Sequence, residues 1–295
     1  LKHMDKPKEE KGIDAVFLSH AHADHAQYLH FLRFDIPIYS TDATRIILKV
    51  LEETGSNPLS DLITACEAFT FYTNRNGDLS RVTRKNKDFV HERNFKIMKP
   101  NEKVKIGSLE IEMVPVDHSL PGACGYIIYS DEGNLVYTGD IRFHGSNAEL
   151  SKRFISNAKA SKPKWMLCEG TRINSLEKNS EEDIKNKISE MISKAEKLVF
   201  IEHPIRDLDR VKSIYEATKE NKRDFVVTLK LAYLIRELGE LCSFSLDDVK
   251  ILLPKKSWGL VCKKDTNYKL VEADYATWER EFIKMKNSIT YEELQ

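Results

Sequence analysis

The stretch that decides the fold is residues 16–25, which read "VFLSHAHADH". The apolar run over residues 13–18 predicts a buried strand that ends where the histidines begin. Small alanines alternate with His20 and His22, so a tight loop can aim these two imidazoles at one point. Asp24 and His25 open a predicted helix and are aimed at a neighbouring point. The spacing therefore predicts two adjacent cation sites at a strand end.

The ligand types indicate which cations these are. Imidazole nitrogen and carboxylate oxygen suit Zn²⁺ or a similar borderline ion. The cluster contains no cysteine, which argues against a structural zinc site of the thiolate type. The expected cofactors are two divalent ions, with Zn²⁺ preferred. The alternative is an exposed histidine-rich loop that binds nothing.

Two later segments can supply the missing ligands. His118 lies in "PVDHSLPGACGY" after an apolar β stretch, and Asp140 lies in "NLVYTGDIRFHG" after another. Each residue follows the end of a predicted strand, as His20 does. If these strands belong to one sheet system, their ends converge at a common edge. Asp140 has two carboxylate oxygens and could bridge both ions.

The first part of the chain is predicted to be rich in strands. Short strands are expected at residues 13–18 and 36–39, and a continuous β region at 103–138 with a turn at Gly107. Asp42 is expected to cap a helix that ends at Gly55. Residues 75–99 are polar and basic, which favours an irregular surface insertion or, alternatively, a phosphate-contacting patch.

The pattern changes after residue 164. Strands are predicted at 164–169, 197–202, 225–228 and 249–254, and they alternate with helices that start at Ser180 and cover 207–220 and 229–240. The helix after Ser180 is expected to bury Met191. This alternation predicts a parallel α/β sheet. The expected domains are therefore residues 1–170, rich in metal-type ligands, and residues 171–295, an α/β module.

The composition restricts the function. The 46 basic and 46 acidic residues among 295 cancel, so any contact with nucleic acid must use local basic groups. No apolar run approaches the roughly 18 residues of a membrane span, so no membrane partner is expected. The five cysteines are scattered without a paired motif, which favours free thiols in a reducing, cytoplasmic setting.

These motifs resemble a known family. "SHAHADH", "DHSLPGACGY" and "YTGD" are similar, in order and in strand-end placement, to the successive metal-binding motifs of the metallo-β-lactamase fold. The resemblance covers about residues 13–145. It implies that one metal is held by His20, His22 and His118, that the other is held by Asp24 and His25, and that Asp140 bridges them.

A second resemblance concerns "KPKWMLCEGTRI", in which Glu169 closes a strand before the α/β module. This arrangement resembles the β-CASP nucleases, including RNase J and the archaeal cleavage and polyadenylation factors. The resemblance implies a metallo-β-lactamase αββα sandwich with an inserted parallel α/β (β-CASP) domain. It also implies that Glu169 acts beside the metals, where it helps to protonate the departing oxygen, and that Asp24 orients the nucleophile.

The implied activity is metal-dependent hydrolysis of RNA phosphodiester bonds, internally or from the 5′ end, by a hydroxide bridging two metals. The expected partner is single-stranded RNA, bound through Arg172, His203, Arg206 and Lys230. A homodimer or a processing-complex partner is a further expectation. Two further motifs of the family, both histidines, are expected after the inserted domain. No histidine follows His203 in this sequence, so the sequence is expected to be part of a longer protein.

Three alternatives remain open. A small-molecule hydrolase of the glyoxalase or lactonase type shares the same metal motif without a nucleic-acid substrate. A DNA-directed β-CASP nuclease shares the domain arrangement. An inactive scaffold subunit of a processing complex is a non-enzyme alternative, although such subunits typically lose metal ligands that this sequence keeps.

Overall fold

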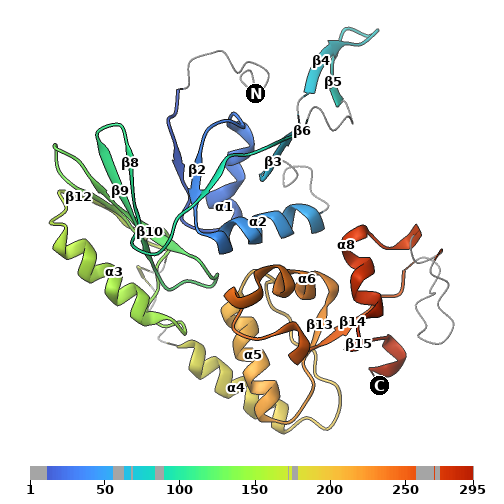
Figure 1. Ribbon diagram of the computed structural model, residues 1–295. Coiled ribbons are helices and arrows are strands. Elements are labelled where there is room, and N and C mark those ends of the chain that lie inside the picture. Colours follow the sequence, from blue (N-terminus) through green and yellow to red (C-terminus); the bar gives the residue numbers. More distant parts are fainter. Residues whose placement is uncertain are drawn as a thin grey trace. The chain divides into compact units, whose positions relative to one another are not determined.

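The computed structural model describes residues 12–55, 63–67, 69–83, 90–171, 173–174, 179–256, 269 and 273–294 (Figure 1). The chain divides into two compact units. The first contains residues 1–118, 122–143 and 147–173, and the second contains residues 119–121, 144–146 and 174–295. Among the described helices, none has the length and apolarity needed to cross a bilayer.

The first unit begins with a small parallel sheet in the order β1-β2-β7, formed by Val16–Phe17, Ile38–Ser40 and Phe95–Ile97. Between β1 and β2 lie helix α1 (Ala23–Ala26) and the 3₁₀ helix η1 (Gln27–Phe31). Helix α2 (Asp42–Thr54) follows β2 and ends at Gly55, as predicted. Its N-cap is Thr41, whose hydroxyl accepts from the Thr44 amide, so the prediction of Asp42 as the cap is wrong.

A five-stranded sheet in the order β12-β11-β10-β9-β8 forms the larger part of this unit. Its strands are β8 (Lys103–Ile106), β9 (Leu109–Pro115), β10 (Cys124–Tyr129), β11 (Leu135–Tyr137) and β12 (Trp165–Leu167). Strands β8 to β11 form an antiparallel meander, whereas β12 pairs parallel to β11. The predicted turn at Gly107 is confirmed, with a φ of +59° that glycine adopts without strain.

The two sheets meet through an apolar core. Phe17 of β1 lies against Tyr126 of β10 with ring centroids 5.5 Å apart, and the Tyr126 hydroxyl donates to the Leu18 carbonyl at 2.8 Å. On the opposite face of the large sheet, helix α3 (Ala148–Ala160) buries Phe154 against Val114 and Ile127 (Figure 1). A layer of two sheets with a helix outside is therefore present, as the metallo-β-lactamase prediction requires.

Within residues 75–99, the described residues 75–83 and 90–99 are more regular than expected. Strand β6 (Val90–Glu92) pairs with β3 (Ala65–Glu67), and β5 (Leu79–Thr83) pairs with β4 (Phe69–Thr73). Strand β7 joins the first sheet beside β2. The prediction of an irregular insertion is wrong for these strands. Strand β5 forms a local hairpin with β4, whereas β6 and β7 pair with segments more distant in the chain, and this pairing orders residues whose local pattern is polar.

The second unit contains a parallel sheet in the order β13-β14-β15, formed by Val226–Thr228, Lys250–Leu252 and Ser288–Ile289. Its main helices are α4 (Glu181–Ser193), α5 (Leu208–Glu220) and α6 (Leu229–Leu238). Ser180 caps α4 in a reciprocal capping box with Asp183, as expected for a serine at that position. Short 3₁₀ turns η3 (Gly239–Leu241) and η4 (Leu246–Asp248) lead to β14.

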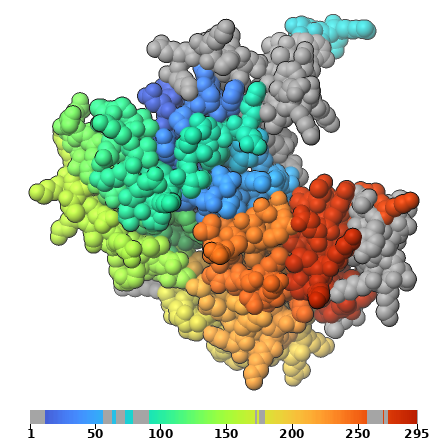
Figure 2. Space-filling view, in the orientation of Figure 1, coloured from blue at the N-terminus to red at the C-terminus, as the bar shows by residue number. Residues whose placement is uncertain are grey.

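The end of the chain packs on α6. Helix α8 (Thr277–Arg280) continues as η5 (Glu281–Lys284), and η6 (Tyr291–Glu293) follows β15. The Tyr233 ring of α6 lies 5.2 Å from the Trp278 ring and 6.4 Å from the Phe282 ring. Figure 2 shows α6 in orange beside this segment in red.

Two predictions for the second unit are wrong. Residues 197–202 form no strand, and Phe200 is 86% exposed within that segment. Met191 of α4 is 69% exposed, whereas its neighbour Ile192 is buried. Only one narrow face of α4 packs against α5, so the apolar run at this end of the helix is only partly covered.

Candidate metal centre

Sheet topology brings the candidate ligands to one edge. Strands β9, β11 and β12 run in the same direction, because β10 lies antiparallel between β9 and β11 and β12 is parallel to β11. Their carboxyl ends are followed by His118, Asp140 and Glu169, respectively. The Cys124 amide at the start of β10 donates to the Ser19 carbonyl at 3.0 Å, which ties the loop of His20 to the same edge.

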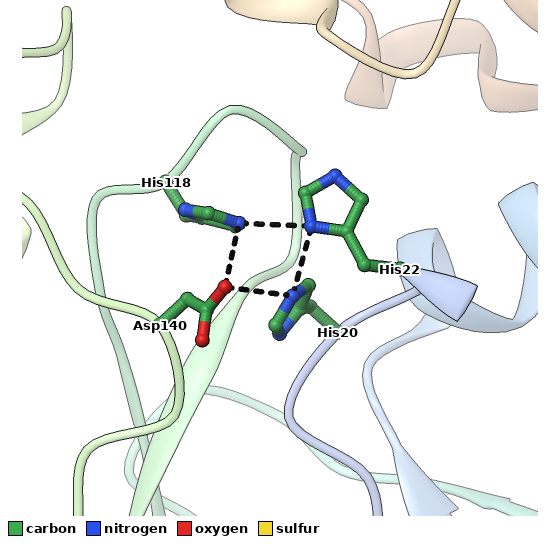
Figure 3. Close-up of side chains that lie close together, drawn as sticks. All are labelled: His20, His22, His118 and Asp140. Atoms are coloured by element: carbon green, nitrogen blue, oxygen red, sulfur yellow. Dashed lines mark hydrogen bonds and ion pairs between the residues drawn. The ribbon is translucent and has the colours of Figure 1, made fainter. Parts of the chain in front are cut away.

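Four side chains at this edge form a compact donor set, shown in Figure 3. One ligand atom each from His20, His22, His118 and Asp140 lies within 4.8 Å of all the others. His22 Nδ1 is 3.0 Å from His20 Nε2 and 3.1 Å from His118 Nε2. Asp140 Oδ2 is 3.6 Å from the Nε2 atoms of His20 and His118.

The environment keeps two of these imidazoles neutral. Burial, followed by the nearby His118, lowers the pKa of His20 from 6.5 to about 2. Burial, followed by His22, lowers the pKa of His118 to about 4. A neutral imidazole offers its nitrogen lone pair to a metal without first losing a proton. Three imidazole nitrogens and one carboxylate oxygen therefore fit a divalent ion of the zinc type.

A second group lies on the other side of the Asp140 carboxylate. His25 Nε2 is 3.2 Å from Asp140 Oδ1 and 3.7 Å from Asp24 Oδ2. The Asp24 side chain is 79% exposed, so Asp24 lies at the rim, outside the four-residue donor set. The predicted ligands are thus brought together as a compact set of four, with His25 and Asp24 adjacent to it.

Negative charge accumulates around Asp140. Its pKa is raised, first by burial and then, against a lowering effect of His25, by the carboxylates Glu169 and Asp24. Carboxylates that raise one another's pKa are destabilised by their mutual repulsion. A bound cation would relieve that repulsion, which agrees with a donor set that fits a divalent ion.

Glu169 is held by main-chain amides. Its Oε1 accepts from the Ile141 amide at 3.2 Å and its Oε2 accepts from the Thr171 amide at 3.1 Å. Burial raises the pKa of Glu169, but hydrogen bonds from Thr171 and Ile141 outweigh it and the net pKa is lowered. Glu169 also lines a cavity of about 400 Å³ together with His25 and Asp140. It is therefore an ionised carboxylate beside the donor set.

The predicted substrate-binding residues belong to the second unit, apart from Arg172, which lies outside the described residues. Arg206 lies before α5 and Lys230 lies in the first turn of α6. Burial, and then the charge of Arg206, lowers the pKa of Lys230, so these two cations are close enough to repel. His203 borders a separate, largely apolar cavity of about 510 Å³.

Three further residues that shape this site were not predicted from the sequence. Ser19 Oγ lies 3.1 Å from His20 Nδ1 and 3.5 Å from His25 Nδ1. Asp117 and Arg142 form an ion pair beside His118. All three flank predicted ligands, and polar residues next to strand-end ligands are the signal that could have identified them.

The comparison with protein families agrees with this geometry. The family model of the beta-lactamase superfamily domain matches residues 2–197, more than half of the chain. The chain therefore belongs to this superfamily, and the His/Asp donor set corresponds to its metallo-β-lactamase fold.

Two curated proteins are similar in sequence to this chain. Ribonuclease J 2 of Streptococcus pyogenes serotype M3 is 20% identical over 264 residues, which are 87% of this chain and 42% of that protein. Probable RNase MJ4 of Methanocaldococcus jannaschii is 25% identical over 137 residues, 45% of this chain and 28% of that protein. The chain thus spans less than half the length of each of these relatives.

A solved structure matches almost the whole chain. A crystal structure of a protein of unknown function from Enterococcus faecalis V583 aligns with a TM-score of 0.65 at 22% identity. The alignment covers 97% of this chain and 57% of that one. This similarity supports the fold of the chain and says nothing about its substrate.

Proposed function

We propose that this chain is the metal-holding part of a metal-dependent ribonuclease, which hydrolyses RNA phosphodiester bonds at two divalent ions, with Zn²⁺ as the preferred ion. The observation that carries the proposal is the extent of the similarity to Ribonuclease J 2. It covers 264 residues and thus extends beyond the metal-type ligands into the second unit. A relative that shared only the metal motif would match only the first unit.

In this proposal His20, His22 and His118 would hold one ion, Asp24 and His25 would hold the other, and Asp140 would be shared between them. The positions of the two Asp140 oxygens support this assignment, because Oδ2 faces His20 and His118 while Oδ1 faces His25. Asp24 is exposed at the rim, and the 3.7 Å between its Oδ2 and His25 Nε2 supports the pairing of these two residues on the second ion.

Two bound ions would supply Lewis-acid activation of water and would neutralise the phosphodiester charge. The protein's own groups provide the orientation. Asp24 would orient the attacking water from the rim. The lowered pKa of Glu169 favours its carboxylate form, so Glu169 would orient a proton donor and would not itself protonate the leaving oxygen.

We further propose that residues 171–295 form a β-CASP α/β domain that binds single-stranded RNA. The parallel β13-β14-β15 sheet with helices α5 and α6 supports this proposal. The proximity of Arg206 and Lys230 also supports it, because a bound phosphate would offset the repulsion between these two cations. Arg172 and His203 complete the proposed set of RNA contacts.

A second candidate is a small-molecule hydrolase of the lactonase or glyoxalase type. The cavity of about 400 Å³ beside Asp140 and Glu169 favours it, because Tyr137, Met166 and Leu167 contribute apolar surface there. Ligand pockets commonly combine such apolar walls with a few polar groups. A phosphodiester makes little use of apolar walls, so substrate choice separates the two candidates.

The test compares three substrates on the zinc-loaded protein. These are a 5′-labelled single-stranded RNA of about 20 nucleotides, DNA of the same sequence, and a simple lactone or thioester. Cleavage of RNA that is lost in chelator and in Asp140→Ala supports the proposal. Hydrolysis of the lactone or thioester without RNA cleavage would establish the second candidate instead, and cleavage of DNA alone would indicate a DNA-directed nuclease.

A further inference from the structure

Arg142 and Asp117 form a buried ion pair between two loops that carry candidate ligands. Arg142 Nε lies 3.4 Å from Asp117 Oδ1, and their side chains are only 12% and 0% exposed. Asp117 directly precedes His118, and Arg142 follows Asp140 by two positions. The ion pair therefore joins the loop after β9 to the loop after β11.

The guanidinium contacts more than the carboxylate. Arg142 Nη2 donates to the His118 carbonyl at 3.0 Å, and the Arg142 amide donates to the Asp117 carbonyl at 3.0 Å. A planar guanidinium can hold a carboxylate and a carbonyl in one fixed arrangement, which a lysine ammonium does less well. Arg142 thereby fixes the backbone of His118 relative to its own loop.

The same loop is anchored on its other side by helix α3. The Asp117 amide donates to Ser151 Oγ at 2.9 Å, and Ser151 is fully buried. The His118 loop is thus held between α3 and Arg142. The backbone from which the His118 imidazole extends is therefore anchored on both sides.

We infer that Arg142, together with Asp117, is a positioning residue that sets the separation between the His118 imidazole and the Asp140 carboxylate. The inference rests on the proposed function, in which these two groups hold metal. His118 Nε2 and Asp140 Oδ2 lie 3.6 Å apart, on either side of the position an ion would take. Groups that orient metal ligands typically change metal affinity about 10- to 100-fold when they are removed.

The first unit contains a matched pair that lacks this role. Arg45 donates to Asp42 through Nε at 3.0 Å and Nη2 at 2.7 Å. Its side chain is 37% exposed, and the pair lies in the first turn of α2. Removal of Arg45 therefore shows how the loss of an arginine–aspartate pair away from the ligand loops changes zinc affinity.

The experiment measures the affinity of the metal-free protein for Zn²⁺ by competition with a chromophoric chelator. Arg142→Met and Asp117→Asn should each weaken zinc binding about 10- to 100-fold, whereas Arg45→Met should leave it unchanged. Ile127→Val, which loosens the core of the same sheet, should lower the thermal midpoint of the metal-free protein without changing zinc affinity.

Arg142→Lys serves if Arg142→Met does not fold, because it keeps a charge near Asp117 but cannot hold the His118 carbonyl in the same way. Zinc binding by Arg142→Lys should fall between wild type and Arg142→Met. Wild-type zinc affinity in a folded Arg142→Met or Arg142→Lys variant would overturn the inference. Wild-type protein that binds zinc but does not cleave RNA would refute the ribonuclease proposal and leave this inference standing.

Discussion

Asp140 Oδ1 lies 3.2 Å from His25 Nε2, while the other oxygen of the same carboxylate faces His20 and His118 at 3.6 Å. One side chain thus touches both groups of candidate ligands. A carboxylate in this position is suited to bridge two ions, because its two oxygens lie beside different ligand nitrogens. Asp140 is therefore the residue on which the proposed two-ion arrangement most depends.

The first prediction is that Asp140→Ala lowers the zinc content and reduces RNA cleavage by at least about a hundredfold. The reason is that, in the proposed two-ion arrangement, both ions would lose an oxygen ligand at once. Zinc per chain is measured by elemental analysis after dialysis, and cleavage with the labelled RNA. Asp24→Ala should also abolish cleavage, while the far-ultraviolet spectrum of both variants stays that of a folded protein.

Asp131→Ala is the control, because Asp131 lies exposed in the turn between β10 and β11. It should keep the wild-type zinc content and cleavage rate. If Asp140→Ala retained the zinc content and the cleavage rate of Asp131→Ala, the bridging assignment would be wrong.

The second prediction concerns Gly139, which has a φ of +56°. A Cβ at this position would lie 2.9 Å from the Cys124 carbonyl and 2.9 Å from the Ser19 Cβ. Gly139→Ala should therefore destabilise the protein by at least about 1–2 kcal/mol and weaken zinc binding, because the loops of His20 and Asp140 must move apart. Urea unfolding with and without zinc measures both effects.

Gly170→Ala is the matched control in the same unit, since a Cβ there meets no atom within 4 Å and its φ is not in the left-handed region. It should unfold at the wild-type urea concentration. Equal unfolding midpoints for the two alanine variants would show that the close approach of Gly139 and Ser19 does not constrain the site.

The convergence of His20, His118 and Asp140 could be predicted from the sequence, because strand ends that share a direction meet at one edge of a sheet. The clamp of Arg142 on Asp117 could not be predicted, since it depends on the relative position of two loops. Helix α3 was also missed, because only Ser151 and Phe154 of its residues are buried and its apolar stripe is correspondingly narrow. For residues 197–202 the opposite happened. Their apolar pattern predicted a strand, but the segment is largely exposed and pairs with no described strand of the sheet.

The third prediction is that the metal-free protein loses stability as the pH falls below about 6.5. In the folded state the pKa of His20 is about 2 and that of His118 is about 4, against 6.5 for an ordinary histidine. The unfolded chain therefore binds protons that the folded chain does not. Each histidine contributes a loss of about 1.4 kcal/mol per pH unit below 6.5, down to its folded pKa.

Urea unfolding in chelator between pH 5 and 7 measures this slope. His118→Gln should reduce the slope by about 1.4 kcal/mol per pH unit below pH 6, because glutamine does not titrate. Ile127→Val removes no titrating group, so it serves as the control and should leave the slope unchanged. An identical slope in wild type and His118→Gln would mean that His118 titrates normally in the folded protein.

The fourth prediction concerns the proposed RNA contacts of the second unit. Affinity for single-stranded RNA should fall as salt rises, because cations that contact phosphates release counterions. Arg206→Ala should weaken binding several-fold and reduce the slope of log affinity against log salt by roughly 0.7, the value expected for one phosphate contact on a single strand.

The control is Lys194→Ala, which removes a cation that is 71% exposed at the end of α4. It should change the affinity and the salt slope by less than Arg206→Ala does. Fluorescence anisotropy with a labelled oligonucleotide, in chelator to prevent cleavage, measures both. If Arg206→Ala matched Lys194→Ala at every salt concentration, Arg206 would be an ordinary surface cation and the RNA path would have to be sought elsewhere.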